Sequence, residues 1–346
     1  MPEMYPLVIS KITKNTTKSA LISFEVPETE KERFRFEAGQ YLTLETKINE
    51  KLVRRSYSIC STIDEGLQVA IKEVPEGTFS TYANRSLRKD DLMMVAPPDG
   101  RFRYLSSSKA QTLVGFAAGS GITPVMSIIK TALLDHPENS FYLVYGNKTP
   151  EDTMFYNELK DLEKAFSGRL SIQWVFSRAN VEGSLFGRVE ANVINRTLKL
   201  LEGTVDKFFL CGPEKMIETA SDILYSNGVE KESVLFELFT SSTKTNEIEV
   251  KTEEGGSLEI TYDELTHKIE NTDGKSVLDA ALQNQLDVPY SCQGGVCSSC
   301  IARIKSGTAV MENNQILTDE EVEEGLILTC IAHATSSHLA VDYDDV

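Results

Sequence analysis

The pattern of apolar and polar positions changes twice along the chain, and its first part alternates with a period of two. Short runs such as residues 41–45 and 67–72 place apolar and polar side chains in alternation, and turn residues separate the runs. This period predicts short strands that each bury one face. A succession of such strands favours a small closed barrel. We therefore expect an antiparallel β-barrel domain over residues 1–107.

From about residue 108 the pattern becomes continuous apolar runs that alternate with helical periods. Five runs predict buried strands, at residues 112–118, 141–145, 172–176, 207–210 and 233–236. Helical segments such as 125–134 and 153–166 lie between them. Strands joined by helical crossovers form a doubly wound parallel sheet, whose ligands bind at the carboxyl ends of the strands. An α/β domain with a five-stranded parallel sheet is expected over residues 108–239.

The last part of the chain combines one helix with short alternating segments. An amphipathic helix is predicted at residues 276–282, and alternating segments occur at 301–304 and 339–343. The polar stretch 240–247 has no periodicity and is expected to be a flexible linker. A third domain, of the α+β class, is therefore expected over residues 248–346. A chain of 346 residues is indeed too long for one ordinary core.

Charge is distributed unevenly between these parts. The net charge is −17, and residues 248–346 hold 19 Asp and Glu against 5 Lys and Arg, which gives −14. This balance argues against nucleic acid as a partner, because phosphates require basic patches. An acidic last domain would suit a transient partner with a basic patch. An ordinary solvated surface explains the same charge equally well.

The chain carries no sign of membrane insertion or secretion. No apolar run is long enough to span a bilayer, and the N-terminus lacks the apolar core of a signal peptide. Of the six cysteines, four form one pattern near the C-terminus, which leaves Cys60 and Cys211. We therefore expect no membrane partner, and a reducing cytoplasm is the expected setting.

The cysteine pattern is the most specific chemical signal in the sequence. Cys292, Cys297 and Cys300 are spaced C-x4-C-x2-C, and Cys330 follows at a distance. This is the ligand spacing of a plant-type [2Fe–2S] cluster, whose two irons require four thiolates. Glycines between the first two cysteines free the backbone to fold over the cluster. A zinc site would usually pair its cysteines in two short knuckles, and a disulfide framework suits small secreted chains. The spacing therefore favours the cluster.

Two short motifs lie on the predicted barrel. Residues 55–58 read Arg-Ser-Tyr-Ser, and residues 77–80 read Gly-Thr-Phe-Ser. An aromatic ring can stack on a flavin, and a guanidinium matches a diphosphate. A glycine-led turn into a helix offers N–H groups to phosphate oxygens. Each motif also has a bland interpretation, with Tyr57 as a barrel residue, Arg55 as a solvated charge and Gly77 as a turn.

The ends of the predicted parallel strands carry a second set of candidate residues. In chain order they are Gly119, Ser120, Gly121, Thr123 and Pro124, then Tyr145 to Lys148, then Ser177 and Arg178, then Cys211, Gly212 and Pro213, and finally Glu237. Such strand ends meet at one edge of the sheet. Individually, the glycines could form a tight turn, Cys211 could be a packed core residue, and Glu237 could be a surface carboxylate.

Taken together and in this order, the motifs resemble the ferredoxin–NADP reductase family, with a flavin-binding barrel and a pyridine-nucleotide domain. Residues from about 248 resemble a plant-type ferredoxin, which implies a β-grasp fold. The resemblance implies an FAD cofactor, NADPH or NADH as electron donor, and one [2Fe–2S] cluster. The implied metal ligands are Cys292, Cys297, Cys300 and Cys330.

The resemblance also implies roles for individual residues. Tyr57 would lie on the flavin ring and Ser58 near its N5 edge, while Cys211 and Glu237 would lie beside the nicotinamide. Ser58, Cys211 and Glu237 are thus the candidate catalytic residues. The implied cofactor-binding residues are Arg55, Ser56, Tyr57, Ser58, Ile71, Lys72, Gly77, Thr78, Phe79, Ser80, Gly119, Ser120, Gly121, Thr123, Pro124, Ser177, Arg178, Cys211, Gly212 and Pro213. The family commonly has Glu-Arg-Phe where this chain has Glu-Leu-Phe at 237–239, which leaves the local ion pairing open.

The order of barrel, nucleotide domain and ferredoxin resembles the reductase components of multicomponent oxygenases. Nicotinamide gives electrons in pairs and the cluster takes them singly, so the flavin must stand between them. Such a chain is expected to reduce a partner oxygenase. Ser177 and Arg178 favour NADPH over NADH, because a hydroxyl and a guanidinium suit a 2′-phosphate. Two other classes of protein remain open: a reductase that acts alone on small acceptors or serves a desaturase, and a zinc-stabilised interaction protein.

Overall fold

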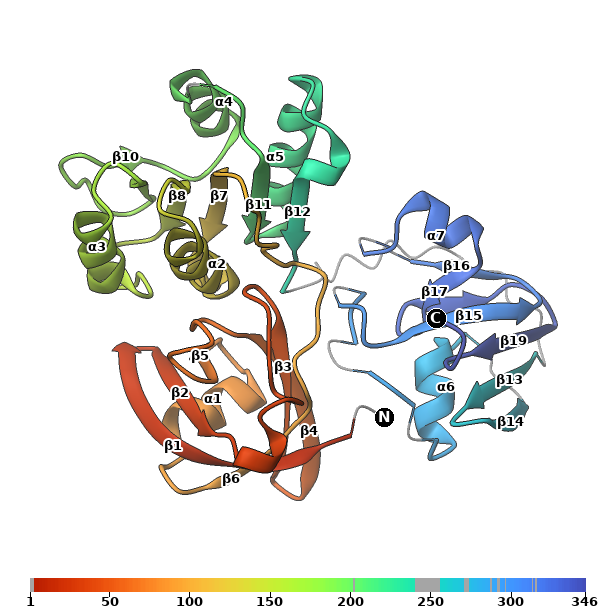
Figure 1. Cartoon of the computed structure of the whole chain (residues 1–346). Helices are drawn as coiled ribbons and strands as arrows, with labels where there is room; N and C mark the ends of the chain where they lie inside the picture. Colours follow the sequence, from red (N-terminus) through yellow and green to blue (C-terminus); the bar gives the residue numbers. More distant parts are fainter. Residues whose placement is uncertain are drawn as a thin grey trace. The chain divides into compact units, whose positions relative to one another are not determined.

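The chain forms two compact units, Met4–Phe239 and a C-terminal unit that begins at Thr240 (Figure 1). The computed structural model describes residues 3–201, 203–239, 256–270, 274–286, 288–290, 293–295, 297–312, 314 and 316–346. The predicted linker at 240–247 lies outside the described residues. No helix in these described ranges is both long enough and apolar enough to cross a membrane.

The first half of the Met4–Phe239 unit is a six-stranded antiparallel sheet in the order β4-β3-β6-β1-β2-β5. Its strands are β1 (Tyr5–Thr16), β2 (Ser19–Glu25), β3 (Tyr41–Ile48), β4 (Lys51–Ser58), β5 (Gln68–Lys72) and β6 (Leu92–Val95). A bridge between Ile59 and Val69 joins the β4 end of the sheet to β5. The Cys60 N–H also donates a hydrogen bond of 3.0 Å to the Gln68 carbonyl. The two edges of the sheet therefore meet, which confirms the predicted barrel.

The barrel is filled by the apolar positions of its alternating strands. Leu42, Leu44 and Ile71 are fully buried, and the helix α1 (Thr78–Arg85) adds Phe79 and Ala83 to this core. A short 3₁₀ turn, η1 (Glu28–Glu30), lies between β2 and β3. Because β-strand side chains alternate, the polar positions between these apolar residues point away from the core.

The second half of this unit is a parallel sheet in the order β10-β9-β8-β7-β11-β12. Its strands are β7 (Thr112–Ala118), β8 (Ser140–Asn147), β9 (Leu170–Phe176), β10 (Leu185–Phe186), β11 (Lys207–Cys211) and β12 (Val234–Glu237). All five predicted strands are present. The additional edge strand β10 has two residues, which is too short to give a periodic signal.

The helices of the parallel sheet follow from its winding. They are α2 (Ile122–Asp135), α3 (Tyr156–Ala165), α4 (Ala191–Leu200) and α5 (Glu214–Ser226), with 3₁₀ turns η2 (Gly119–Gly121) and η3 (Lys231–Ser233). Strand order proceeds from β7 to β9 in one direction and from β11 to β12 in the other. Right-handed crossovers therefore place α2 and α3 on one face and α5 on the other (Figure 1).

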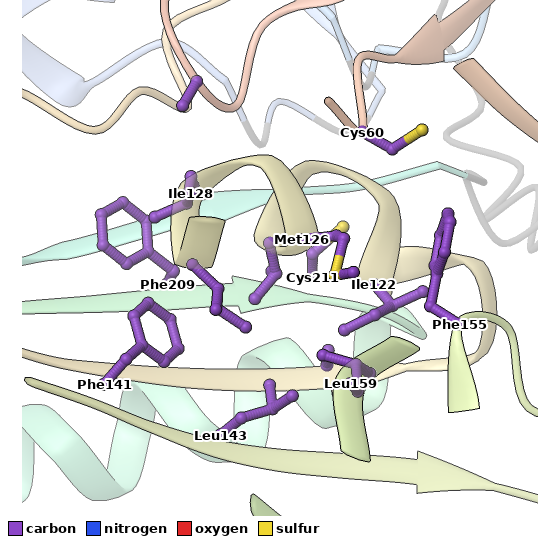
Figure 2. Close-up of a cluster of buried hydrophobic side chains, with 14 of the residues drawn as sticks. Cys60, Ile122, Met126, Ile128, Phe141, Leu143, Phe155, Leu159, Phe209 and Cys211 are labelled. Carbon is purple, nitrogen blue, oxygen red and sulfur yellow. The ribbon is translucent and has the colours of Figure 1, made fainter. Parts of the chain in front are cut away.

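The barrel and the parallel sheet share one hydrophobic cluster. Cys60 and Ala70 from the barrel side pack with Ile122 and Met126 of α2 and with Cys211 of β11. Figure 2 shows Cys60 on the opposite side of α2 from the sheet residues Phe141 and Leu143. Helix α2 is thus sandwiched between the sheet and the barrel.

The C-terminal unit has a five-stranded sheet in the order β14-β13-β19-β15-β17. The strands are β13 (Ser257–Tyr262), β14 (Leu265–Glu270), β15 (Ile301–Ser306), β17 (Leu326–Leu328) and β19 (His338–Asp342), and a separate pair is formed by β16 (Ala309–Met311) and β18 (Ala332–Ala334). Strands β13 and β19 are parallel, and the other pairs are antiparallel.

One helix packs on this sheet, as the sequence predicted. Helix α6 (Val277–Gln283) begins at Ser276, whose hydroxyl accepts a hydrogen bond of 3.1 Å from the Asp279 N–H. Its apolar face packs into the core of the sheet. A second, short helix, α7 (Asp319–Glu323), has a capping box at Thr318. A mixed sheet with one packed helix is the predicted β-grasp arrangement.

Candidate functional site

The candidate catalytic residues meet where the end of β4 reaches the ends of β11 and β12. The Ser58 hydroxyl donates a hydrogen bond of 2.8 Å to Glu237 Oε2. Cys211 lies directly beside Glu237 in the register of the parallel sheet. All three side chains are buried. Ser58 of the barrel and Glu237 of the parallel sheet therefore form a polar contact, although they are 179 positions apart in sequence.

Burial determines the protonation states of Glu237 and Cys211. Burial raises the pKa of Glu237 to about 8, and the hydrogen bond from Ser58 opposes that rise. Burial, and then the charge of Glu237, raises the pKa of the Cys211 thiol well above its usual value. At neutral pH the junction therefore holds a mostly neutral carboxyl and a neutral thiol. Such a junction suits an uncharged aromatic ring better than a phosphate.

The Arg-Ser-Tyr-Ser motif occupies β4, and strand alternation decides which arginine is available. Arg54 is buried, and its Nε donates a hydrogen bond of 2.8 Å to Glu45 Oε2. Arg55 is exposed, and its Nη1 donates to the Arg54 carbonyl at 2.6 Å. Ser56 Oγ lies 3.2 Å from the Thr43 hydroxyl oxygen. The sequence alone did not show that the first arginine of the pair is structural.

The two barrel motifs lie side by side. The rings of Tyr57 and Phe79 have centroids 5.5 Å apart. Burial raises the pKa of Tyr57, which therefore remains neutral at physiological pH. Arg55 shares a strand face with Tyr57, because the two are separated by two positions. This arrangement gives an aromatic surface with a cation at its edge.

The start of α1 provides N–H groups beside that surface. A Cβ on Gly77 would lie 2.5 Å from Val74 Cγ2, so a larger residue would require the neighbouring side chains to move. Helix α1 has no side-chain cap, and the first N–H groups of a helix have no partner within it. Thr78 and Phe79 thus offer donors at the positive end of the helix, where phosphate binds readily. The Ser80 hydroxyl instead accepts a hydrogen bond of 3.2 Å from the Val74 N–H.

Two further barrel candidates lie on β5. The Ile71 side chain is fully buried in the barrel core, and its carbonyl accepts a hydrogen bond of 3.0 Å from Asn84 Nδ2. Lys72 is half-buried, and burial lowers its pKa. The charges that act on it include those of Asp152 and Lys148 from the nucleotide half. Lys72 is therefore within electrostatic reach of the nucleotide half, whereas the Ile71 side chain lies in the barrel core.

The glycine-rich strand ends of the sheet pack backbone against backbone. A Cβ on Gly121 would lie 2.1 Å from the Cys211 carbonyl oxygen, and one on Gly212 would lie 3.1 Å from Ala118 Cβ. The Tyr145 hydroxyl donates a hydrogen bond of 2.8 Å to the Gly119 carbonyl. These contacts bring the ends of β7, β8 and β11 together at one edge.

The remaining nucleotide candidates border the same edge. The Thr123 hydroxyl donates a hydrogen bond of 3.0 Å to the Ser120 carbonyl, and Pro124 is buried in the first turn of α2. Pro213 is the residue from which α5 begins. These three residues lie at the starts of α2 and α5, next to the strand ends, and neither helix start has a side-chain cap.

Arg178 follows β9 at this edge. The N–H groups of Ser177 and Arg178 donate to the carbonyls of Asn147 and Lys148, at 3.0 and 2.9 Å. The Arg178 side chain is exposed. A guanidinium held by its backbone and open to solvent can take an anionic group.

The cysteine loop of the C-terminal unit fits an iron–sulfur cluster. Cys297 and Cys300 are buried, and Cys330 is half-buried. The Gly295 N–H donates a hydrogen bond of 3.2 Å to Cys330 Sγ, and such bonds to sulfur help to set the potential of an iron–sulfur cluster. Among the described residues no three candidate ligands converge on one ion, and a [2Fe–2S] cluster needs only two cysteines at each iron. Cys292 lies outside the described residues.

A buried network holds two of the cysteine positions together. The N–H and the hydroxyl of Thr329 both donate to the Cys300 carbonyl, at 3.1 and 3.0 Å. The Tyr343 hydroxyl donates to Thr329 Oγ1 at 2.8 Å. Thr329 immediately precedes Cys330, so this network ties the segments of Cys300 and Cys330 to Tyr343, which follows β19. The sequence did not reveal it, because Tyr343 lies outside every motif.

Comparison with known families divides the chain in the same way. Residues 6–104 match the model of the oxidoreductase FAD-binding domain, 116–222 the oxidoreductase NAD-binding domain and 260–335 the 2Fe-2S iron-sulfur cluster binding domain. Each match falls within one predicted domain, and the predicted boundaries themselves stay predictions. FAD, NAD(P)H and a [2Fe–2S] cluster are therefore the cofactors of this chain.

Full-length relatives decide the family. One subunit of the 1,2-phenylacetyl-CoA epoxidase of Escherichia coli (strain K12) is 34% identical, and the match covers 99% of this chain and 99% of that protein. The chain belongs to this family of flavin and iron–sulfur reductase components. The ferredoxin reductase component of 3-ketosteroid-9-alpha-monooxygenase from Rhodococcus rhodochrous is 29% identical, with 97% of this chain and 96% of that protein covered.

A solved structure of another reductase has the same fold as this chain. Phthalate dioxygenase reductase has a TM-score of 0.63 at 23% identity, and the match covers 98% of both chains. The family and its matched domains make the chain an NAD(P)H-dependent flavin and iron–sulfur oxidoreductase.

Proposed function

We propose that this reductase passes electrons from NADPH through FAD and its [2Fe–2S] cluster to a partner oxygenase. The observation that carries the proposal is the contact between Ser58 and Glu237, which joins the barrel to the nucleotide sheet beside Cys211. A flavin on the barrel and a nicotinamide at the strand ends would meet at this point. FAD held there would supply the conversion of an electron pair, delivered as hydride, into single electrons.

The flavin would be held by the paired barrel motifs. Tyr57 supplies a neutral ring for stacking, and Phe79 supports it from the side. Arg55, together with the first N–H groups of α1, binds the diphosphate. Ser58 lies at the end of the same strand, so its hydroxyl reaches the reacting edge of the ring. Residues Ser56, Lys72, Gly77, Thr78 and Ser80 complete the proposed site, and Ile71 contributes only through its place in the core.

The nicotinamide would be positioned by the strand ends. Cys211 and the mostly neutral Glu237 form a buried surface that excludes water from the ring. The Glu237 carboxyl can hold a proton next to the Ser58 hydroxyl without bulk solvent. Gly119, where a Cβ would meet nothing within 4 Å, would let the nucleotide diphosphate approach the backbone at the end of β7.

NADPH rather than NADH is proposed as the donor because of Arg178. Its exposed guanidinium stands at the end of β9 beside Ser177, where a 2′-phosphate can be bound. Loss of one charge-assisted contact costs about 1.5–3 kcal/mol, roughly ten- to hundredfold in affinity. We expect Arg178→Ala to lower kcat/KM for NADPH by this factor and to leave kcat/KM for NADH nearly unchanged. A wild-type preference for NADH, or an unchanged NADPH/NADH ratio in the variant, would refute the assignment.

The partner is proposed from the relatives and from charge. The relative with 34% identity belongs to an epoxidase that is named for phenylacetyl-CoA, and others serve steroid and glycine betaine monooxygenases. We propose phenylacetyl-CoA epoxidase, or a related aromatic or aliphatic oxygenase, as acceptor, with a basic patch that faces the acidic C-terminal unit. A cytoplasmic setting accords with this and stays a prediction.

Reconstitution tests the partner directly. The purified reductase is mixed with the oxygenase component of a phenylacetyl-CoA epoxidase, and NADPH consumption is compared with and without oxygenase and substrate. We expect consumption to depend on both. Rapid turnover with small acceptors alone, and no stimulation by the oxygenase, would favour a reductase that acts without a protein partner.

A further inference from the structure

The loop Ser61–Gly66, which follows the end of β4, is a rigid element of the barrel. The Ser61 hydroxyl donates a hydrogen bond of 2.6 Å to the Gly66 carbonyl. The Thr62 N–H donates to Glu65 Oε2 at 2.9 Å, and the Glu65 N–H donates back to Thr62 Oγ1 at 3.3 Å. These reciprocal bonds fix the Glu65 carboxylate in one place.

Helix α2 of the nucleotide half grips this loop with two side chains three positions apart. The buried Ser127 hydroxyl donates a hydrogen bond of 2.7 Å to the Ser61 carbonyl. Lys130 Nζ lies 3.1 and 3.2 Å from the two oxygens of Glu65. It also lies 2.6 Å from Glu158 Oε1, on α3. Residues at this spacing share one helix face, so both contacts act on the same side of α2.

The other end of α2 is fixed to the catalytic strand ends. The helix begins directly after Gly121, where a Cβ would lie 2.1 Å from the Cys211 carbonyl oxygen, so no side chain would fit. Ser127 lies about 7.5 Å further along the helix axis. Helix α2 therefore connects the end of β11 to the barrel loop. That loop starts three residues after Ser58, which bonds Glu237 across the same junction.

Cys60 is close to the ionic cluster of Lys130, Glu65 and Glu158, because the charges of these residues act on its thiol. Its thiol is buried in the hydrophobic cluster that α2 shares with the barrel. Burial raises the pKa of Cys60, and the charges of Lys130, Glu158 and Glu65 also act on it. Cys60 is two residues from Ser58. Cys60 therefore lies in the chain between Ser58 and the loop that α2 contacts, and its side chain packs in the cluster that α2 shares with the barrel.

We propose that Lys130 is a positioning residue for hydride transfer, which acts by locking helix α2 to the barrel loop through Glu65. The lock holds Ser58 at a fixed separation from Cys211 and Glu237, and so holds the flavin against the nicotinamide. This inference rests on the proposed function. Hydride transfer requires close approach of the reacting atoms, and a displacement of about 1 Å can cost as much as a hundredfold in rate.

The Lys130 contact is suited to a permanent lock. Burial would lower the pKa of Lys130, but hydrogen bonds and charges from Glu158 and Glu65 outweigh burial, so its pKa is raised. The ammonium therefore stays charged at physiological pH. Helix α3, which carries Glu158, is held to the barrel separately, because the Phe155 N–H donates to Asn15 Oδ1 at 3.0 Å. Loss of Glu158 should thus leave α3 in place.

The test compares single-turnover flavin reduction in matched variants. Oxidised enzyme is mixed anaerobically with NADPH over a range of concentrations, which separates the limiting rate of hydride transfer from the nucleotide Kd. We expect Lys130→Met and Glu65→Gln to lower the limiting rate about tenfold, with Kd changed less than about twofold. Lys130→Arg should restore most of the rate. Lys164→Met, at an exposed lysine of α3, should remain within about twofold of the wild type.

A second readout is independent of activity. Hydrogen exchange of the loop 61–66 and of α2 should become faster in Lys130→Met and Glu65→Gln, whereas FAD and iron contents stay stoichiometric. The double variant should be no slower in hydride transfer than Lys130→Met alone, because both changes break one contact. Equal limiting rates in the wild type and Glu65→Gln would overturn the proposal, as would additive losses in the double variant. If NADPH does not reduce the wild-type flavin, the proposed function itself is wrong. If it does, these comparisons test the role of Lys130 separately.

Discussion

The two units of this reductase build their redox sites in opposite ways. In the Met4–Phe239 unit, the contact at the heart of the site joins Ser58 to a residue 179 positions away. In the C-terminal unit, three of the four predicted ligand cysteines fall within nine positions of the sequence, and the Gly295 N–H of that segment donates to Cys330. The first site therefore depends on how two folded halves pack. The second depends on the conformation of a loop that a few hydrogen bonds secure.

This difference predicts that a substitution in the cysteine loop affects only the C-terminal unit. A substitution at the packed junction should affect both halves of the Met4–Phe239 unit. The largest expected effect is at the cluster. Cys297→Ser should abolish cluster absorption and remove both irons, because each iron needs two thiolates. FAD content and flavin reduction by NADPH should remain near the wild-type level. Iron analysis and the visible spectrum decide this, and a variant that keeps two irons with a full spectrum would break the assignment.

A pH effect is expected at the packed junction and not at the loop. Folding raises the pKa of Glu237 from 4.5 to about 8, so the folded chain binds this proton more tightly. The resulting stabilisation is complete below about pH 4.5 and is lost as the pH rises through about 8, by up to about 1.4 kcal/mol per pH unit. Glu237→Gln should flatten this loss, as measured by thermal release of the flavin between about pH 5 and pH 9.

The matched control for this pH effect is the exposed Glu182. Glu182→Gln should keep the wild-type dependence of flavin release on pH. If Glu237→Gln shows the same dependence as the wild type, the buried carboxyl does not carry a proton in the folded chain, and the neutral junction described above is wrong.

The smallest expected effect concerns the hydrogen bond between Tyr343 and Thr329, which lies next to Cys330. Tyr343→Phe removes the hydroxyl that donates to Thr329, at a cost of about 1 kcal/mol. Cluster loss after dilution into chelator should become about fivefold faster. Tyr262→Phe is the control, because its ring packs edge-on against Tyr343, with centroids 6.1 Å apart. Equal cluster lifetimes in the two variants would show that the hydroxyl does not secure the loop.

The same contrast explains what could be predicted from the sequence. Local periods in the sequence predict the barrel and the parallel sheet, and the structure has both folds. The spacing of the cysteines predicts the cluster ligands, and that assignment stays a prediction. Two features were not accessible. Arg54 and Arg55 are equivalent in a motif, and only strand alternation shows that Arg54 is buried against Glu45. The lock between Lys130 and Glu65 joins positions 65 apart and disturbs no local pattern.

The most direct test of the central claim follows the two redox groups separately in one experiment. Wild-type enzyme and Cys297→Ser are mixed anaerobically with one equivalent of NADPH, and flavin and cluster absorbance are recorded over time. In the wild type, the flavin absorbance should fall first and the cluster absorbance second, and in the variant the flavin should still be reduced. A cluster that stays oxidised in the wild type, or one that is reduced before the flavin, would contradict the path from NADPH through FAD to the cluster.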